Sequence, residues 1–289
     1  MKKLGFILIC ITLIFSSSLF AQTVPYSIGR IVVSSDGNEH DHDDWAATPF
    51  TLALLAAKEL QDKLTVYTFS DHIWGGSDYQ KKKGKTEMLI SALEGQKIYN
   101  FKKSNFLEAV ADSTKAINAI VKEINKSKAS NPLTIVAAGP MHVVGSAISQ
   151  SKKAKLKYVR IISHSNWNDR HSDKPYDWEE HSGWTWNEIK ASFESFGLIC
   201  DRISDQNGGK DYEGMKAPKA MFDWINTSPI RNTSEKAKKQ LDWLYQRQLT
   251  CVKKGDFDPS DAGMIIYLLT GKQKTSPEDA RAIIENSVH

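Results

Sequence analysis

Residues 31–60 read IVVSSDGNEHDHDDWAATPFTLALLAAKEL, an apolar run followed by an acidic turn and then a helix-like run. Five of the nine residues over 36–44 are acidic. Acidic side chains crowded at the end of a strand repel one another unless a cation lies among them. The stretch therefore predicts a strand over 31–34, a helix over 45–60, and a hard-metal site in the turn between them.

The rest of the chain continues this alternation of short apolar runs and longer helical patterns. Further strands are expected over 64–69, 133–137, 158–162 and, with a weaker pattern, 198–203; further helices are expected over 85–93, 106–124, 141–150 and 188–196. From residue 217 the chain reads as mostly helical, with patterns over 219–225, 234–249, 261–269 and 276–286. The strand candidates are apolar throughout, as strands covered on both faces must be. We therefore predict an α/β fold: a mostly parallel central sheet with helices on both faces, in a single domain with a helical C-terminal part.

The N-terminus has the layout of a secretory signal peptide. Lys2 and Lys3 precede an apolar run over 4–15, which small polar residues and Ala21 follow. Cleavage after Ala21 would leave a domain over 22–289 in the periplasm or outside the cell. An uncleaved membrane anchor is the alternative, but the run is short for a bilayer span.

Composition and motifs exclude several classes of function. The full chain has a formal net charge of +4 with its lysines scattered, which is no footprint for nucleic acid. There is no G-x-S-x-G elbow, P-loop or dinucleotide fingerprint, which argues against serine hydrolases and nucleotide-cofactor enzymes. Cys200 and Cys251 are the cysteines beyond the signal, and we expect two buried thiols rather than a disulfide.

The acidic turn favours one kind of metal. Oxygen ligands with no cysteine nearby favour Ca²⁺, and after it Mg²⁺, over Zn²⁺. Asp43 and Asp44 also open the predicted helix, where capping and the helix dipole stabilise carboxylates by about 0.3–1 kcal/mol without any metal. That effect accounts for one or two of the five acids. His40 and His42 leave a transition metal as the alternative.

Polar residues also follow the other predicted strands. In open parallel sheets, ligands bind beyond the carboxyl ends of the strands. Many donors and acceptors at such an edge suit sugar hydroxyls, and a tryptophan offers an apolar platform for a sugar ring. The candidate contacts are Asp71, His72 and Trp74 after the second strand, His142 after the third, and Asn166, Trp167, Asn168 and Asp169 after the fourth. A polar surface loop is the alternative for the last group.

The acidic turn resembles the signature of the nucleoside hydrolase-like superfamily, in which a strand ends in D-x-D-x-x-x-D-D before a helix. Aligning the terminal pair with Asp43 and Asp44 places Glu39 where the family has its second Asp, so the resemblance implies Glu39 or Asp43 as the base. The first Asp of the family then falls on Gly37. Asp36 lies one residue earlier, which requires a one-residue bulge if Asp36 is to bind the metal.

Two later segments are also similar to motifs of that family. TIVAAGPM over 134–141 matches a strand before G-P-L-T-N, and it implies that the backbone carbonyl of Ala138 binds calcium. DFDPSDA over 256–262 matches a late Asp that completes the metal shell. Asp258 and Asp261 both qualify, and Asp261 is favoured because the predicted helix follows it directly; a simple N-cap is the alternative.

Together these matches imply an exported Ca²⁺-dependent hydrolase of an N-riboside or another glycosidic bond. The implied metal ligands are Asp36, Asp43, Asp44, the Ala138 carbonyl and Asp261. Glu39 or Asp43 would deprotonate a metal-bound water, which would attack the anomeric carbon in one inverting step. Members of the family are often homo-oligomers, but no surface in the sequence reveals an interface.

Two other functions remain open from the sequence. Export and the abundance of tryptophan make a saccharide substrate a competitor to a nucleoside, and both would be small-molecule partners. A non-catalytic carbohydrate-binding protein with a structural cation is the main alternative. A phosphoesterase is a third reading, but it would need two cations roughly 3.5–4 Å apart.

Overall fold

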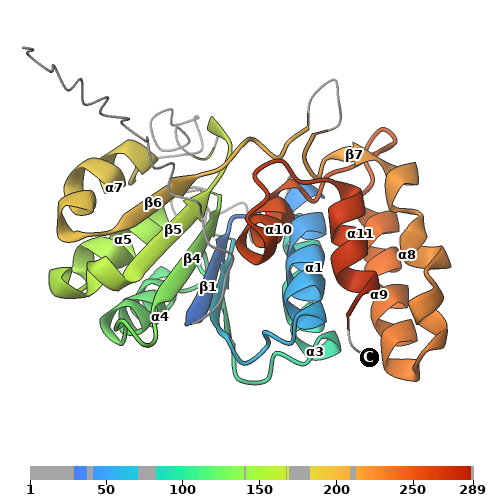
Figure 1. Ribbon diagram of the computed structural model, residues 1–289, viewed down its shortest axis with the longest axis horizontal. Helices are drawn as coiled ribbons and strands as arrows, with labels where there is room; N and C mark the ends of the chain where they lie inside the picture. Colours follow the sequence, from blue (N-terminus) through green and yellow to red (C-terminus); the bar gives the residue numbers. More distant parts are fainter. Residues whose placement is uncertain are drawn as a thin grey trace, which may run out of the picture.

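A six-stranded parallel sheet runs through the middle of the protein (Figure 1). The computed structural model describes residues 29–37, 42–70, 83–139, 141–166, 168, 183–208 and 213–287. The strands are β1 (Arg30–Ser35), β2 (Leu64–Phe69), β3 (Asn105–Glu108), β4 (Leu133–Ala138), β5 (Val159–Ser163) and β6 (Ile199–Arg202). They lie in the order β3-β2-β1-β4-β5-β6, and every neighbouring pair is parallel. The predicted α/β fold is confirmed, and this sheet is parallel throughout.

Helices cover both faces of the sheet (Figure 1). On one face lie α4 (Ser113–Asn125), α5 (His142–Gln150) and α7 (Trp186–Phe193); on the other lie α1 (His42–Ala57), α9 (Glu235–Cys251), α10 (Gly263–Thr270) and α11 (Pro277–Glu285). Successive strand residues point to opposite faces. Val32 accordingly packs with the first group of helices, whereas Ile31 and Val33 pack with the second. Burial on both faces is the reason that the strands are continuously apolar.

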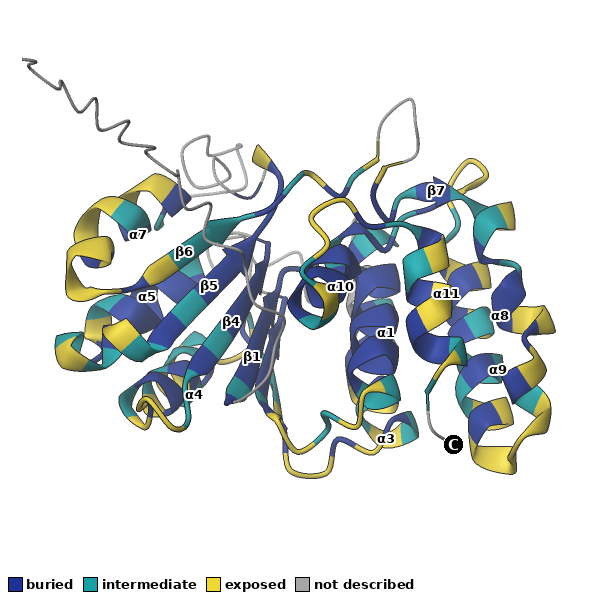
Figure 2. Ribbon diagram, viewed as in Figure 1, coloured by how far each residue is buried: buried dark blue, intermediate teal, exposed yellow. Residues whose placement is uncertain are grey.

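α1 lies between the sheet and the outer helices and is buried on almost every side (Figure 2). A helix that is apolar all round belongs in such a place. Pro49 inside α1 has no amide hydrogen, so the carbonyl of Trp45 loses its usual helical partner. The hydroxyl of Ser91 donates to that carbonyl at 2.6 Å instead. This bond ties the first turn of α1 to η2 (Ile90–Glu94).

The remaining elements are short, and the C-terminal part from residue 217 is largely helical as predicted. They are α2 (Lys83–Leu89), η2 (Ile90–Glu94), α3 (Gly95–Ile98), η3 (Lys153–Tyr158), η5 (Glu194–Phe196), η6 (Lys219–Phe222), α8 (Trp224–Thr227), η7 (Pro229–Asn232) and η8 (Ser260–Ala262). β7 (Ala217–Pro218) and β8 (Asp256–Phe257) form a small antiparallel pair that the sequence did not predict. No helix in the described ranges combines the length and the apolar character needed to cross a membrane.

Two sequence predictions are corrected by the structure. The helix predicted over 106–124 is wrong at its start, because β3 occupies Asn105–Glu108 and α4 begins at Ser113. The Asp112 carboxylate caps α4 by accepting from the Lys115 amide at 2.9 Å. The expectation of two buried thiols holds for Cys251, but Cys200 is only half-buried because it lies on the edge strand β6; both are free.

Candidate metal site

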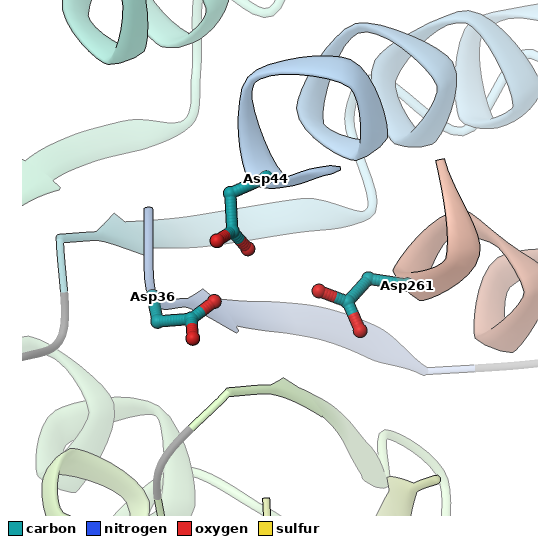
Figure 3. A group of neighbouring side chains, drawn as sticks. All are labelled: Asp36, Asp44 and Asp261. Carbon is teal, nitrogen blue, oxygen red and sulfur yellow. The ribbon is translucent and has the colours of Figure 1, made fainter. Parts of the chain in front are cut away.

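Three carboxylates converge at the carboxyl edge of the sheet (Figure 3). Asp36 directly follows β1, Asp44 lies in the first turn of α1, and Asp261 lies in η8 just before α10. One oxygen from each lies within 4.8 Å of the other two. Two oxygens bound to the same Ca²⁺ are separated by at most roughly 5 Å, since each Ca–O bond is about 2.3–2.6 Å. The donor set therefore suits a hard divalent cation in both chemistry and spacing.

Burial makes this convergence costly without a cation. Asp36 and Asp44 are only 7% and 2% exposed. Carboxylates taken out of water and placed near one another favour ionisation only when positive charge or hydrogen bonds compensate them. The arrangement thus differs from an ordinary acidic surface turn, in which each side chain is solvated on its own.

Backbone geometry fixes Asp36 against β4. Its amide donates to the Ala138 carbonyl at 2.9 Å, so this carbonyl lies beside Asp36 and already accepts one hydrogen bond. A carbonyl oxygen has a second lone pair, which leaves the predicted role of Ala138 open. Gly139 has φ +141°, and a Cβ there would lie 2.7 Å from the Cβ of Asp36. Only glycine allows the two strand ends to approach this closely.

The pKa of Asp43 is raised in the folded protein. Burial, together with the charges of Asp258, Asp36 and Asp261, raises its pKa to about 7. A carboxyl group with a pKa near neutrality can both take and release a proton at physiological pH. The base role of Asp43 stays a prediction.

Tyr67 is a buried polar residue near these acids, and it remains protonated. The Tyr67 hydroxyl donates to the Thr48 hydroxyl at 2.8 Å. Burial, together with the charges of Asp44 and Asp261, raises the pKa of Tyr67. Tyr67 is therefore a neutral hydrogen-bond donor beneath the acids.

The structure separates the two late acids that the sequence left open. The Asp258 carboxylate forms an ion pair with the Lys216 ammonium at 2.8 Å. Asp261 instead joins Asp36 and Asp44, and one of its oxygens lies 2.6 Å from Nε2 of His164. The preference for Asp261 as the converging acid agrees with this geometry.

His164 is a buried histidine to which the sequence analysis gave no role. It follows β5 directly, is 1% exposed, and accepts at Nδ1 from the Gln206 amide at 3.2 Å. Burial lowers the pKa of His164, but hydrogen bonds and charges from Asp205 and Asp261 outweigh burial and raise it to about 9. The Gln206 amide favours a neutral ring, whereas the two acids favour a charged one. In both forms Nε2 carries a hydrogen toward Asp261.

The predicted ligand-binding residues differ in their surroundings. The buried Asn168 amide donates to the His164 carbonyl at 3.4 Å, so it lies next to the acid site. Asn166 is exposed and accepts from Arg202 at 3.3 Å. His142 accepts at Nδ1 from the Trp184 amide at 3.2 Å, which ties α5 to the segment before α7. The predicted residues Glu39, Asp71, His72, Trp74, Trp167 and Asp169 lie outside the described residues.

Sequence reasoning missed His164, Asp205 and Lys216. His164 and Asp205 each lie just beyond the end of a parallel strand, which is the positional signal that could have marked them. Lys216 precedes β7 and carries no such signal, because its ion pair joins segments that only the fold brings together.

Comparison with known proteins gives similar solved structures and a sequence relative. No family model matches the chain. Similar solved structures include the plant nucleoside hydrolase PpNRh1 (12% identity, TM-score 0.47, covering 85% of this chain and 80% of that one). They also include an inosine-guanosine nucleoside hydrolase (10% identity, TM-score 0.47, with the same coverage). A third is an inosine-uridine preferring nucleoside hydrolase from Bacillus anthracis (10% identity, TM-score 0.44, covering 84% and 82%).

The sequence relative has a higher sequence identity to this chain than these structures have. It is the uncharacterized protein P22 of Formosa agariphila, which is 30% identical over 256 residues. The match covers 84% of this chain and 84% of the relative, which is almost the whole of both. The chain belongs to the same family as the uncharacterized protein P22 of Formosa agariphila.

Proposed function

We propose that this protein is an exported, Ca²⁺-dependent hydrolase that cleaves an N-riboside or another glycosidic bond. The observation that carries the proposal is the convergence of Asp36, Asp44 and Asp261 at the edge of the sheet where ligands bind. The resemblance of the acidic turn to the nucleoside hydrolase signature supplies the reaction class.

Asp36, Asp44 and Asp261 would hold the ion, with the Ala138 carbonyl beside them. When bound, such an ion supplies a water of lowered pKa, close to the acids. Asp43 precedes the ligand Asp44 in the first turn of α1 and would accept a proton from that water. The water oxygen would bond to the anomeric carbon, and the leaving group would depart with the bonding electrons and take a proton from solvent, while Asp43 would return its proton to solvent.

The chain's own residues also define the sugar side of the site. Asn168 adjoins the acid cluster through the His164 carbonyl and would orient a ligand hydroxyl at this edge. Asn166 lies on the exposed side of the same segment, where Arg202 holds its side-chain oxygen. Both amides offer donors and acceptors that match sugar hydroxyls. Nucleosides and saccharides share this feature, so the test includes both.

The test begins with calcium rather than with substrate. Calorimetric titration of Ca²⁺ into chelator-stripped protein should show one site, which Asp44→Asn removes. Asp62→Asn is the matched control, because the Asp62 side chain is 64% exposed and pairs with Lys103 on the surface. The Asp62 variant should bind Ca²⁺ as the wild type does. Absence of Ca²⁺ binding by the wild type would overturn the proposal.

Turnover is then measured as sugar release from nucleosides and oligosaccharides, with and without chelator. Release should require Ca²⁺. Asp43→Asn should abolish release while it leaves Ca²⁺ binding in place. Ca²⁺ binding with ligand binding but no release from any substrate would instead support a carbohydrate-binding protein with a structural cation.

Export is tested separately by N-terminal sequencing of the protein recovered from periplasm and medium. A mature chain that begins at Gln22 is the expected result. A protein found only in the cytoplasm, with Met1 retained, would remove export from the proposal and leave the reaction class untouched.

A further inference from the structure

We propose that His164 is a positioning residue for Asp261, and that its Nε2–H sets the affinity of the acid site for a divalent cation. The inference rests on the metal site of the proposed function. It assigns to this histidine a role that the motif resemblance does not contain, since none of the matched motifs includes residue 164.

The contact joins two distant parts of the chain inside the protein. His164 lies at the end of β5, and Asp261 lies 97 residues later in η8. Nε2 is 2.6 Å from Oδ1 of Asp261, and the two side chains are 1% and 13% exposed. A hydrogen bond to an ionised group in such a dry place is worth more than one on the surface. The contact is therefore strong enough to determine where the carboxylate lies.

The ring itself is held from its other side. The Gln206 amide donates to Nδ1 at 3.2 Å, so in the neutral ring the hydrogen resides on Nε2. Gln206 is in turn fixed, because its side-chain amide donates to the carbonyls of Ser204 and Gln273 at 2.6 and 2.8 Å. The Thr275 hydroxyl donates to its side-chain oxygen at 2.6 Å. The imidazole therefore has little freedom to turn away from Asp261.

The consequence for the metal site follows from the carboxylate. With Oδ1 engaged by His164, the plane of Asp261 is set before an ion arrives. Residues behind a ligand typically change metal affinity by about 10- to 100-fold, because they orient the ligand. A second account predicts the opposite change in affinity. If His164 acted through positive charge, it would repel a cation, and its removal would tighten cation binding. The two accounts predict changes of opposite sign.

Lys216 offers the comparison that separates position from charge. Its ammonium pairs with Asp258 at 2.8 Å, and Asp258 is not one of the three converging carboxylates. Lys216→Met removes one positive charge beside the acids, so it should tighten Ca²⁺ binding. A positioning role for His164 predicts the reverse for its loss.

The test uses two polar variants that differ in where they place a donor. In His164→Gln the side-chain nitrogen stands close to the position of Nε2 and can reach Asp261; in His164→Asn it stands near Nδ1 and cannot. Calorimetric titration of Ca²⁺ into chelator-stripped full-length protein should show a Kd raised about 10- to 100-fold for His164→Asn. His164→Gln should recover most of the affinity. Near-ultraviolet circular dichroism in chelator checks that both variants are folded.

Three results would overturn the inference. The first is a Ca²⁺ affinity of both the Gln and the Asn variant that equals that of the wild type. The second is tighter Ca²⁺ binding by His164→Asn, as expected for Lys216→Met. The third is a ¹⁵N NMR signal of His164 Nε2 in the wild type that does not move on addition of Ca²⁺. The last measurement needs no variant to fold. If the wild type bound no Ca²⁺ at all, the proposed function would fail as well; if it bound Ca²⁺ and Asp44→Asn did not, only the role of His164 would remain to be judged by these results.

Discussion

The raised pKa of Asp43 gives a prediction about stability that requires no knowledge of the substrate. An ordinary Asp has a pKa of 3.8, and burial with neighbouring acids raises that of Asp43 to about 7. Between these values the folded protein retains a proton that the unfolded chain has lost. The free energy of unfolding therefore falls as pH rises from about 4 to 7, and the whole loss applies above pH 7.

The size of the effect follows from the same two values. The difference, 7 − 3.8, is about 3 pKa units, and each unit corresponds to about 1.4 kcal/mol, so the ceiling is roughly 4 kcal/mol. Asp43 is only half-buried, so water screens part of this, and we expect about 2 kcal/mol. Asp43→Asn cannot ionise. In chelator it should exceed the wild type by about 2 kcal/mol at pH 8 and match it at pH 4.

Urea unfolding followed by circular dichroism, at pH 4, 6 and 8 in chelator, measures this difference directly. Groups that do not interact with Asp43 titrate alike in both proteins and cancel in the comparison. Millimolar Ca²⁺ should stabilise the wild type at pH 8 and so reduce or reverse the advantage of the variant. Asp62→Asn, which removes an exposed carboxylate, should follow the wild type at every pH. If the difference in unfolding free energy between Asp43→Asn and the wild type stayed constant from pH 4 to 8, the reasoning would be refuted.

Three further substitutions test the packing around the site and the fold. Gly139→Ala would place a Cβ 2.7 Å from that of Asp36, and calorimetry should show Ca²⁺ affinity reduced at least about tenfold because a ligand is displaced. Arg247→Leu removes the partner of Glu87 from an ion pair of 2.8 Å whose side chains are 6% and 13% exposed; urea unfolding should show a loss of about 3 kcal/mol, and no loss would contradict the burial argument. Ser276→Ala removes the hydroxyl that caps α11, and the free energy of unfolding should fall by about 1 kcal/mol, with an unchanged value counting against the cap.

The sequence predicts the sheet well where burial is complete and poorly where it is not. β1, β2, β4 and β5 have helices on both faces, so their apolar runs are continuous and easy to recognise. β3 is an edge strand of four residues with half-buried side chains, and its apolar residues read as the start of the following helix. Burial, rather than intrinsic strand preference, produces the pattern on which the prediction rests.

The site divides in the same way. Crowding of like charges is visible in a sequence, so Asp36 and Asp44 could be identified as candidates. The sequence favours Asp261 over Asp258 only from its place before a helix, whereas the structure separates the two acids through Lys216 and His164, which reach them from other parts of the fold. Neither partner belongs to a local pattern. Contacts between side chains tens of residues apart are the information that a single sequence withholds.

Two basic side chains in the described part of the chain bind acids at this edge of the sheet. A fold that needed only to neutralise its acids could direct a lysine into their centre. Lys216 instead binds Asp258, which is not one of the three converging carboxylates. His164 binds Asp261 through a single oxygen, and a carboxylate with two oxygens has acceptor capacity beyond one such contact. Neither contact occupies both oxygens of a converging carboxylate, which is compatible with the binding of a divalent cation.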